Sequence, residues 1–219
     1  ELDRSGIKNY KLGIAHGWNY FDGVFGQIID QSFNKGVFQK FERTGLYSDF
    51  LGLQYYCRLT LPDIGNKDRN YSDHPEFGDI YPPGIYQLLQ KMNHQYPQKE
   101  IFVTEFGFSD NSDKKRPYWI METINYVLRA KKEGVPVRGM LLWTLINNFE
   151  WSLGTQQKFG LFDESELRQP LKSSLENEGV KSWEAWQIFI KTISNPNSEN
   201  IEKLQKIYDT AKSQFENSK

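Results

Sequence analysis

The fold of this chain is decided by one short stretch near its middle, residues 100–107 (EIFVTEFG). The stretch is an apolar run rich in β-forming residues that ends in a carboxylate and a glycine, and it reads as a strand. Side chains alternate on a strand, so we expect Ile101, Val103 and Glu105 to share one face. A carboxylate at the end of a buried face needs a hydrogen-bond partner. Taken alone, the stretch leaves two interpretations of Glu105 open: a strand-terminal glutamate turned to solvent, or a functional carboxylate.

Strands and helices are expected to alternate on both sides of this stretch. Apolar runs predict strands at residues 12–17, 50–56, 101–105 and 137–144. Apolar residues three or four apart predict helices at residues 25–38 with an interruption at Gly36, 82–96, 116–132, 182–193 and 201–215. Residues 61–79, rich in Pro, Asp, Asn and Gly, predict a long loop. The alternation is typical of parallel strands with helices outside, and no glycine-rich phosphate loop follows the first strand to suggest a dinucleotide-binding fold.

Four strand–helix units are half of an eight-stranded (β/α)8 barrel, an α/β fold that takes about 250 residues. A sheet of this size alone would leave two open edges and one bare face. We therefore expect residues 1–195 to form half of such a barrel domain and residues 196–219 to form an amphipathic helical tail. Another part of the barrel, or another chain, is expected to cover the open edges of the sheet.

The composition of the chain argues against nucleic acid and membrane as binding partners. Lys and Arg number 27 against 28 Asp and Glu, with no basic stripe, so we expect no nucleic-acid binding. No run of about 18 apolar residues is present, so we expect no membrane span. No signal peptide is visible, which favours a cytoplasmic protein, although a fragment would not carry its leader. The single cysteine, Cys57, reads as a core thiol. No spacing of His, Cys and Asp suggests a metal site, and no cofactor is expected.

A second stretch, residues 141–151 (LLWTLINNFEW), changes the interpretation of Glu105. Its tryptophans and Phe149 are compatible with a core, but a glutamate set between Phe149 and Trp151 is harder to explain that way. Aromatic residues make up 15% of the chain, and sugar-binding clefts need flat apolar faces on which a ring can stack. Residues 158–161 (KFGL) follow shortly after this stretch.

Together these motifs resemble glycoside hydrolase family 1, the β-glucosidase-type retaining glycosidases. The family's nucleophile strand ends Thr-Glu-Asn-Gly, and residues 104–107 here read TEFG. Its last barrel strand reads roughly Trp-Ser-Leu-x-Asp-Asn-Phe-Glu-Trp followed by Arg-Phe-Gly-Leu, and residues 143–151 and 158–161 here read WTLINNFEW and KFGL. The resemblance covers about residues 12–174. It implies strands five to eight of the barrel, which is its C-terminal half.

The resemblance implies catalytic roles for two residues. Glu105 corresponds to the nucleophile, and Tyr56 to the tyrosine that donates a hydrogen bond to it. Gln54 stands where the family has an asparagine and is implied to bind substrate, although the longer amide leaves its reach toward the sugar open. The alternative for Tyr55 and Tyr56 is that both pack in the barrel wall. The family's Asn-Glu-Pro motif, which supplies the acid/base glutamate on strand four, is not found in this chain.

Four further residues are implied to bind substrate. Glu150 and Trp151 correspond to the pair that binds sugar hydroxyls, Trp143 to the floor on which the pyranose ring stacks, and Phe159 to an aromatic that lines a subsite. Members that cleave phosphorylated sugars carry a serine at the position of Glu150. A carboxylate there would repel a phosphate, so an unphosphorylated β-glycoside is favoured.

Some features of the sequence stay open. Phe106 and Asn147 depart from the family's Asn and Asp, which indicates a divergent branch without removing a catalytic group. His16 ends the first strand, where packing is at least as good an interpretation as substrate contact. His74 and His94 read as surface or loop residues.

The resemblance thus implies a retaining β-glycosidase that hydrolyses O-glycosidic bonds of unphosphorylated β-glycosides or oligosaccharides by double displacement. Glu105 would be the nucleophile, and the acid/base would lie in a missing N-terminal half. The alternative is a non-catalytic half-barrel that binds a partner half, a second copy or a sugar. Another barrel glycosidase family fits less well, because it would not share residues 148–151 followed by Phe159 and Gly160. The sequence leaves the sugar, the aglycone and the oligomeric state undecided.

Overall fold

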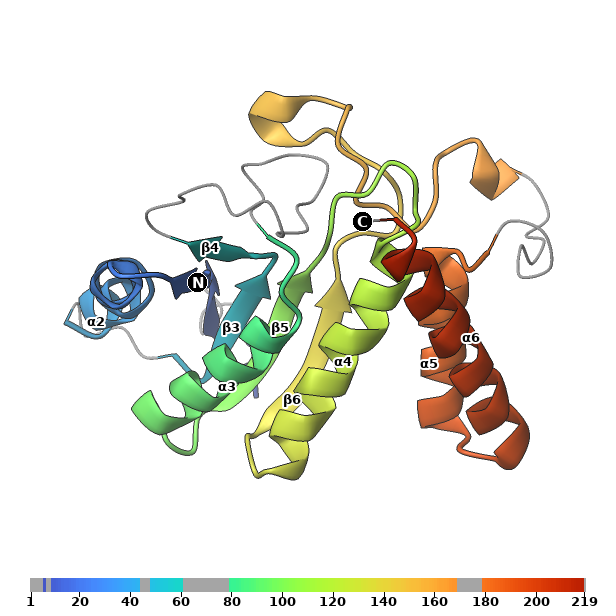
Figure 1. Cartoon of the computed structure of the whole chain (residues 1–219). Coiled ribbons are helices and arrows are strands. Elements are labelled where there is room, and N and C mark those ends of the chain that lie inside the picture. The colour runs from blue at the N-terminus through green and yellow to red at the C-terminus, as the bar shows by residue number, and fades with distance from the viewer. Residues whose placement is uncertain (1–5, 7–8, 44–47, 61–78, 169–178, 219) are drawn as a thin grey trace.

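A four-stranded parallel sheet forms the centre of the molecule. The computed structural model describes residues 6, 9–43, 48–60, 79–168 and 179–218. The strands are β1 (Gly13–Gly17), β3 (Phe50–Tyr55), β5 (Glu100–Phe106) and β6 (Val137–Leu142), in the order β1-β3-β5-β6. All neighbouring pairs are parallel, so their carboxyl ends meet at one edge of the sheet (Figure 1). The four predicted strands are confirmed. The predicted loop at 61–79 and His74 fall outside the described residues, except for Asp79.

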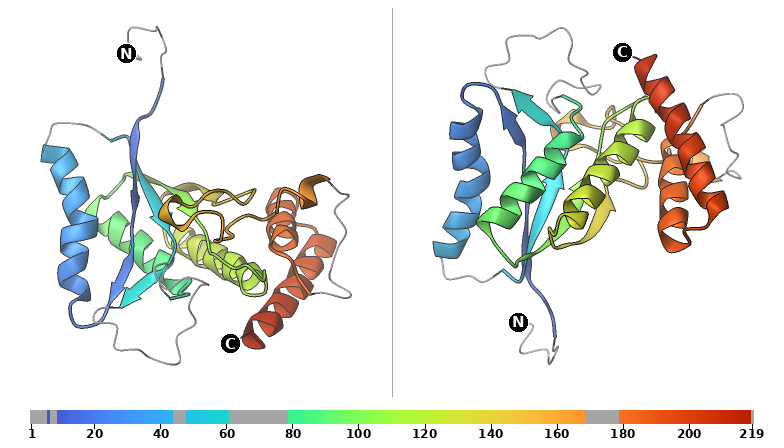
Figure 2. Two further views of the ribbon diagram at one scale, coloured as in Figure 1. Left: turned by 90° about the horizontal axis from the view of Figure 1, so that it is seen from above. Right: turned by 60° about the horizontal axis from the view of Figure 1, so that its bottom comes forward.

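The predicted helices that cover the sheet are also confirmed. The helices α3 (Pro83–Gln95) and α4 (Arg116–Lys132) lie together on one face of it, as Figures 1 and 2 show. Each carries a proline in its first turn, where the missing N–H is tolerated. Their buried stripes pack against the sheet, so the core lies between this layer and the strands. The buried strand residues of that core are Leu51, Leu53, Tyr55, Ile101, Val103, Phe106 and Val137.

The helix near the N-terminus is continuous through Gly36. It consists of α1 (Gly26–Asp30), a π-helical turn (Gln31–Lys35) and α2 (Gly36–Arg43). Gly36 has helical dihedrals, with φ −62° and ψ −33°, so the interruption predicted there is wrong. The irregularity lies in the widened turn before it. That turn contains the buried Asn34, whose amide donates to the carbonyl of Asn19 at 2.8 Å.

Two short strands were not predicted. The strands β2 (Tyr20–Asp22) and β4 (Arg58–Thr60) pair in parallel just beyond the carboxyl ends of β1 and β3. Arg58 exchanges backbone hydrogen bonds of 3.0 Å with Asp79 and forms an ion pair with its carboxylate. These strands are three residues long, too short for a period to emerge in the sequence.

The expectation that Glu105 shares a face with Val103 is wrong, because β5 bulges at Thr104. Leu53 of β3 pairs with Val103, but the next residue, Gln54, pairs with Glu105, so Thr104 is passed over. One extra residue in a strand reverses the alternation beyond it. Glu105 therefore lies on the same face as Gln54, opposite the face that the helices cover.

Phe106 takes the place that simple alternation would have given to Glu105. Its ring is fully buried and lies 5.7 Å from the ring of Trp119 on α4 and 6.0 Å from that of Trp186. The bulge thus puts an aromatic ring into the core and turns a carboxylate away from it. Cys57 is a free, buried thiol, as predicted, and burial raises its pKa to about 12.

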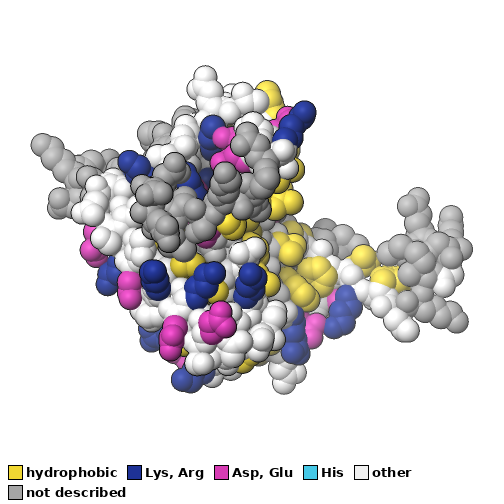
Figure 3. All heavy atoms as spheres, turned by 90° about the vertical axis from the view of Figure 1, so that its right-hand side faces the viewer, with side chains coloured by type: hydrophobic (Ala, Val, Ile, Leu, Met, Phe, Trp, Pro, Cys, Tyr) yellow, Lys and Arg dark blue, Asp and Glu magenta, His cyan; other side chains and the backbone are white. Residues whose placement is uncertain are grey.

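Two C-terminal helices complete the described structure. The helices α5 (Ser182–Ser194) and α6 (Ser198–Glu216) pack against each other and against α4 at one end of the sheet (Figure 1). On the outer surface of this end, basic and acidic side chains are intermixed beside hydrophobic ones (Figure 3). Within the described ranges, no helix is both long enough and apolar enough to cross a membrane. The domain division at residue 195 stays a prediction.

Candidate active site

A pocket of about 460 Å³ opens at the carboxyl ends of β3, β5 and β6. It brings together all seven residues that the sequence singled out, whose chemical roles stay predictions. Two more lining residues, Ser152 and Leu153, were missed, because nothing in their side-chain type indicates a site. The described residues that line it are Gln54, Tyr56, Glu105, Trp143, Glu150, Trp151, Ser152, Leu153 and Phe159.

Glu105 is held by two neutral donors. The Nε2 of Gln54 donates to its Oε1 at 2.8 Å, and the hydroxyl of Tyr56 donates to its Oε2. The bulge makes this possible, since it sets Glu105 directly opposite Gln54 on β3. Hydrogen bonds to a carboxylate are strong and fix its orientation. The interpretation of Glu105 as a glutamate turned to bulk solvent is therefore wrong.

The hydroxyl of Tyr56 stays protonated and so remains a hydrogen-bond donor. Burial raises its pKa above the ordinary value, and the hydrogen bond to Glu105 and the negative charges of Glu105 and Glu150 act in the same direction. The hydroxyl therefore keeps its proton at neutral pH. Phe159 meets the Tyr56 ring edge-on, with ring centroids 5.9 Å apart and an interplanar angle of 89°. Tyr55, by contrast, is fully buried and donates its hydroxyl to the carbonyl of Tyr81, so only one of the two tyrosines faces the pocket.

Glu150 is the second carboxylate of the pocket. The side chain is largely buried, and its Oε1 accepts a hydrogen bond of 3.0 Å from the indole N–H of Trp143. Among the described residues, its Oε2 has no donor. The backbone N–H of Glu150 donates to the carbonyl of Gly154 at 2.7 Å, which closes a tight loop at residues 150–154. One oxygen is thus fixed by the protein and one is available to a ligand.

Trp151 lies at the rim of the pocket and is 88% exposed. It begins the short 3-10 turn Trp151–Leu153, and its φ of 43° is in the left-handed region that non-glycine residues rarely adopt. Phe149 is also largely exposed. Two large aromatic side chains on one solvent-facing loop are typical of a surface that another molecule covers.

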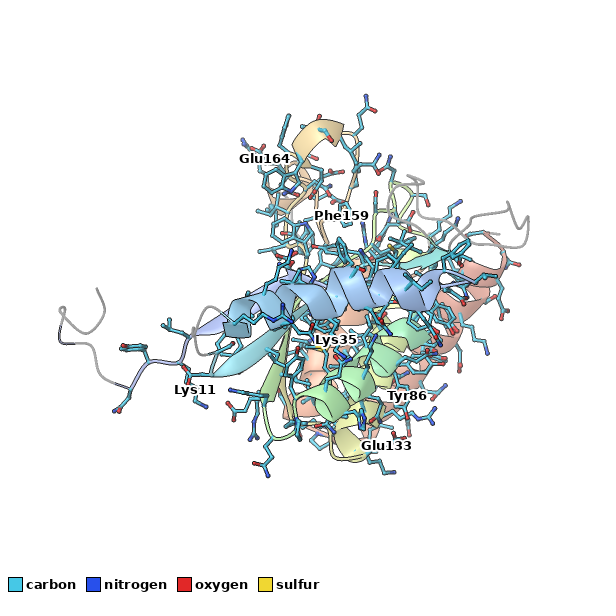
Figure 4. All side chains as sticks on the ribbon, turned by 90° about the vertical axis from the view of Figure 1, so that its left-hand side faces the viewer. Lys11, Lys35, Tyr86, Glu133, Phe159 and Glu164 are labelled. Atoms are coloured by element: carbon cyan, nitrogen blue, oxygen red, sulfur yellow. The ribbon has the colours of Figure 1, made fainter. Side chains whose placement is uncertain are left out.

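The segment that carries Phe159 is fixed by short polar contacts. The Asn147 amide donates to Asp163 at 2.5 Å, and its Oδ1 accepts from the backbone N–H of Gly160 at 2.7 Å. A Cβ at Gly160 would lie 2.4 Å from the backbone nitrogen of Asn147, so only glycine fits this approach. An asparagine both donates and accepts, which explains how the departure at position 147 is accommodated. Figure 4 shows Phe159 among the loops above the sheet.

His16 does not line this pocket. Its ring packs among Trp18, Phe33 and Phe38, with centroids 5.4 to 6.2 Å away, and burial lowers its pKa. Of the two interpretations of His16, packing is therefore confirmed. His94 is exposed on α3, as predicted. In the described part of the chain, no three His, Cys, Asp or Glu side chains are grouped as metal ligands would be.

Comparisons with known proteins agree with this geometry. A sequence model of glycosyl hydrolase family 1 matches residues 48–176. A β-galactosidase of Sulfolobus acidocaldarius is 36% identical over 162 residues, which cover 66% of this chain and 32% of the relative. Beta-glucosidase A of Thermotoga maritima is 31% identical over 129 residues, which cover 52% of this chain and 29% of the relative. The chain spans about a third of the length of these curated relatives.

The fold is shared with solved structures. A β-glucosidase from Pyrococcus furiosus superposes on 94% of this chain with a TM-score of 0.70 and 23% identity, and the match covers 45% of that structure. A mutant of a hyperthermophilic β-glucosidase superposes on 75% of the chain with a TM-score of 0.64 and 28% identity. The prediction that the chain is part of a (β/α)8 barrel is therefore confirmed.

Proposed function

The chain belongs to glycosyl hydrolase family 1, and from this premise we propose that it supplies the nucleophile and sugar-binding residues of a retaining β-glycosidase. The observation that carries the proposal is the carboxylate of Glu105, which lies in an open pocket with a neutral donor on each oxygen. A nucleophile must be correctly aimed, and the two donors, Gln54 on β3 and Tyr56 directly after it, fix both oxygens of the carboxylate.

Double displacement assigns the following steps to this carboxylate. One oxygen of Glu105 attacks the anomeric carbon, and the bond to the leaving-group oxygen breaks as that oxygen receives a proton. Water then attacks the same carbon, gives up a proton, and releases Glu105. The hydroxyl of Tyr56 holds one carboxylate oxygen in place throughout. Gln54 orients the other oxygen and so acts on the nucleophile rather than on the sugar alone.

Glu150, Trp143 and Trp151 supply the sugar contacts in this proposal. The Oε2 of Glu150, which has no donor among the described residues, can accept from a sugar hydroxyl, while its Oε1 is held by Trp143. Aromatic faces at the pocket suit the apolar side of a pyranose ring, and the exposed ring of Trp151 adds such a face at the rim. The negative charge of Glu150 disfavours a phosphorylated sugar. Unphosphorylated β-glycosides or oligosaccharides are therefore the proposed substrates. The relatives include a β-galactosidase and a β-glucosidase, so both glucosides and galactosides are candidate substrates.

A second part of the barrel is proposed to supply the acid/base. Retaining enzymes need two carboxyl groups about 5–5.5 Å apart. Among the described residues that line the pocket, the other carboxylate is Glu150, which already accepts from Trp143 and is assigned to the sugar. In the described sheet, β1 and β6 each pair with one neighbour and leave an open edge. An N-terminal half that pairs with both edges would close the barrel and bring the missing acid to the pocket.

Hydrolysis of an aryl β-glucoside tests the proposal. The full chain is assayed alone and after a separately expressed N-terminal barrel half of a family member is added. Glu105→Gln provides the inactive control, and Glu100→Gln, at the other end of the same strand, provides the matched active control. We expect activity only after complementation, retained in Glu100→Gln and lost in Glu105→Gln.

The other outcomes contradict parts of the proposal. Full activity from the chain alone would mean that another of its carboxylates serves as the acid. Sugar binding without hydrolysis in any mixture would favour the alternative, a non-catalytic half-barrel.

A further inference from the structure

The side chain of Gln214 on α6 forms hydrogen bonds with the loop that precedes α4. The Nε2 of Gln214 donates to the carbonyls of Asp113 at 3.3 Å, Lys114 at 3.1 Å and Val180 at 3.1 Å. Its Oε1 accepts from the backbone N–H of Val180 at 3.0 Å. The amide thus ties three segments together: the end of α6, the entry to α4 and the entry to α5.

Gly179 shows how closely this side chain is fitted. Its φ is +84°, and a Cβ there would lie 2.1 Å from the Oε1 of Gln214. The backbone conformation favours glycine at this position, and a Cβ here would displace the amide of Gln214. The Gln214 amide is therefore closely packed against the backbone of Gly179. Gln205 of the same helix is exposed and donates to Asp209 one turn away at 2.9 Å.

Asp113, whose carbonyl accepts from Gln214, also binds Arg116 through its carboxylate. Its φ of 55° is in the left-handed region, and its carboxylate accepts from the backbone N–H of Ser182 at 2.9 Å and from the Ser182 hydroxyl. The same carboxylate forms an ion pair with Arg116 at 2.8 Å. Arg116 is almost fully buried and also donates to the Ser182 hydroxyl at 3.0 Å.

Arg116 in turn holds two loops of the pocket. Its Nη1 donates to the carbonyl of Lys158 at 2.5 Å and to that of Phe108 at 3.4 Å. Lys158 directly precedes Phe159, whose ring supports Tyr56, the donor to Glu105. Phe108 lies three residues after Glu105 itself. A guanidinium with its donors in a fixed fork is suited to hold several carbonyls at once.

We propose that Gln214 is a positioning residue, through which α6 fixes the Lys158–Phe159 segment and thereby the Tyr56–Glu105 pair. The path runs from Gln214 to Asp113, Arg116 and the Lys158 carbonyl. The helix α6 thus stabilises the loops of the pocket, and we call the contacts from Gln214 through Asp113 and Arg116 to Lys158 the brace. The catalytic meaning of this role depends on the proposed function, whereas the contacts that define it do not.

Hydrogen exchange of the full chain tests the brace without any need for activity. Amides in residues 156–162 are compared among wild type, Gln214→Ala and two controls on α6. Gln205→Ala makes the same substitution at an exposed site, and Tyr208→Phe removes the hydrogen bond of 2.6 Å from α6 to Glu122 on α4, away from the path. We expect exchange at 156–162 to be about tenfold faster in Gln214→Ala and unchanged in both controls.

Two additions make the test decisive. In an Arg116→Lys background, Gln214→Ala should have no further effect on residues 156–162, because the path is already broken. Should Gln214→Ala fail to fold, Gln214→Asn, whose amide is one methylene shorter, carries the same comparison. Equal exchange at 156–162 in wild type and the folded Gln214 variant would overturn the proposal, and so would additive effects of the two substitutions.

A second readout connects the brace to the chemistry. A dinitrophenyl fluoroglucoside, whose leaving group departs without acid assistance, labels a nucleophilic carboxylate covalently. Labelling of Glu105 should be about tenfold slower in Gln214→Ala and unchanged in Gln205→Ala. Faster exchange together with unchanged labelling would overturn the positioning role. Absence of labelling in every variant, wild type included, would count against the proposed function, while the exchange result would still decide whether the brace exists.

Discussion

Glu100 and Glu105 are the same residue type at opposite ends of one strand, and they are held in opposite ways. Glu100 accepts from Lys11 at 2.6 Å and from Arg138 at 2.8 Å, and these cations lower its pKa, with the Lys11 hydrogen bond as the largest cause. Glu105 accepts from the neutral side chains of Gln54 and Tyr56. No lysine or arginine in the described ranges forms an ion pair with Glu105. Figure 4 shows Lys11 away from the loops that carry Phe159.

The two ends of β5 therefore serve different purposes: one end joins chain segments at the surface, and the other presents a carboxylate to the pocket. At the end near Lys11, opposite charges cancel at the surface, which adds little beyond joining three chain segments. At the end near Tyr56, two neutral donors fix the carboxylate, and no lysine or arginine of the described ranges pairs with it, so its oxygens face the pocket. The bulge at Thr104 makes the second arrangement possible, because it turns Glu105 out of the core and toward the pocket.

The largest expected effect separates the two glutamates by activity. In the complemented enzyme, Glu105→Gln should lower kcat by about 10⁴-fold or more, because an amide cannot form the covalent intermediate. Glu100→Gln should change kcat by less than about twofold, because an exposed ion pair far from the chemistry contributes little. Steady-state kinetics on an aryl β-glucoside measure both. A comparable loss in the two variants would mean that Glu105 acts through folding rather than as the nucleophile.

Phe106 tests whether the bulge in β5 places an aromatic ring in the core while Glu105 faces the pocket. Phe106→Ala removes a fully buried ring beside Trp119 and should lower the free energy of unfolding by about 3–5 kcal/mol. Phe102→Ala is the matched control on the same strand, because Phe102 is only partly buried and meets Phe50 edge-on at 5.0 Å. Its cost should be clearly smaller. Urea denaturation measures both, and a larger loss in Phe102→Ala would contradict the packing described for the bulge.

The paired tyrosines give the next effect in size. Tyr56→Phe removes one donor to Glu105 and should lower kcat by about 10²-fold, the size of a lost hydrogen bond to a charged group. Tyr55→Phe removes the hydroxyl that reaches the Tyr81 carbonyl and should lower thermal stability with little change in kcat. Kinetics and melting curves together distinguish the two. The assignment fails if Tyr55→Phe is the variant that loses activity.

The smallest effect is the pH dependence at Glu100. Because its folded pKa is lowered from the usual 4.5, its contribution to stability is present above that value and is lost as the pH falls through the lowered pKa. The melting temperature of Glu100→Gln should therefore be lower than that of wild type by about 2 °C at pH 7, and the two should converge in acid. Melting curves across this pH range measure the difference. A gap that widens in acid would contradict the ion pairs.

The sequence predicted what depends on local pattern. The four sheet strands and the helices α3 to α6 follow from apolar spacing and from proline or glycine at their ends, and the structure reproduces them closely. All seven predicted site residues line one pocket, because they follow the carboxyl ends of parallel strands or lie in the loops beyond.

What the sequence could not predict depends on partners. The bulge at Thr104 is a property of the register between β5 and β3, so alternation along β5 alone gave the wrong face for Glu105. Glycine is a poor helix former, so the sequence predicts a break at Gly36, yet the irregular turn lies before it. The path from Gln214 to Arg116 and Lys158 joins residues up to about a hundred positions apart, and no local pattern marks it.

The most direct test of the central claim is the site of covalent labelling by the dinitrophenyl fluoroglucoside. The fluorine slows release of the sugar, and the activated leaving group removes the need for the acid, so the full chain alone is sufficient. Mass spectrometry of proteolytic fragments should find one sugar attached to Glu105, with the same label in Glu100→Gln and none in Glu105→Gln. A label on any other carboxylate, or one that persists in Glu105→Gln, would contradict the account.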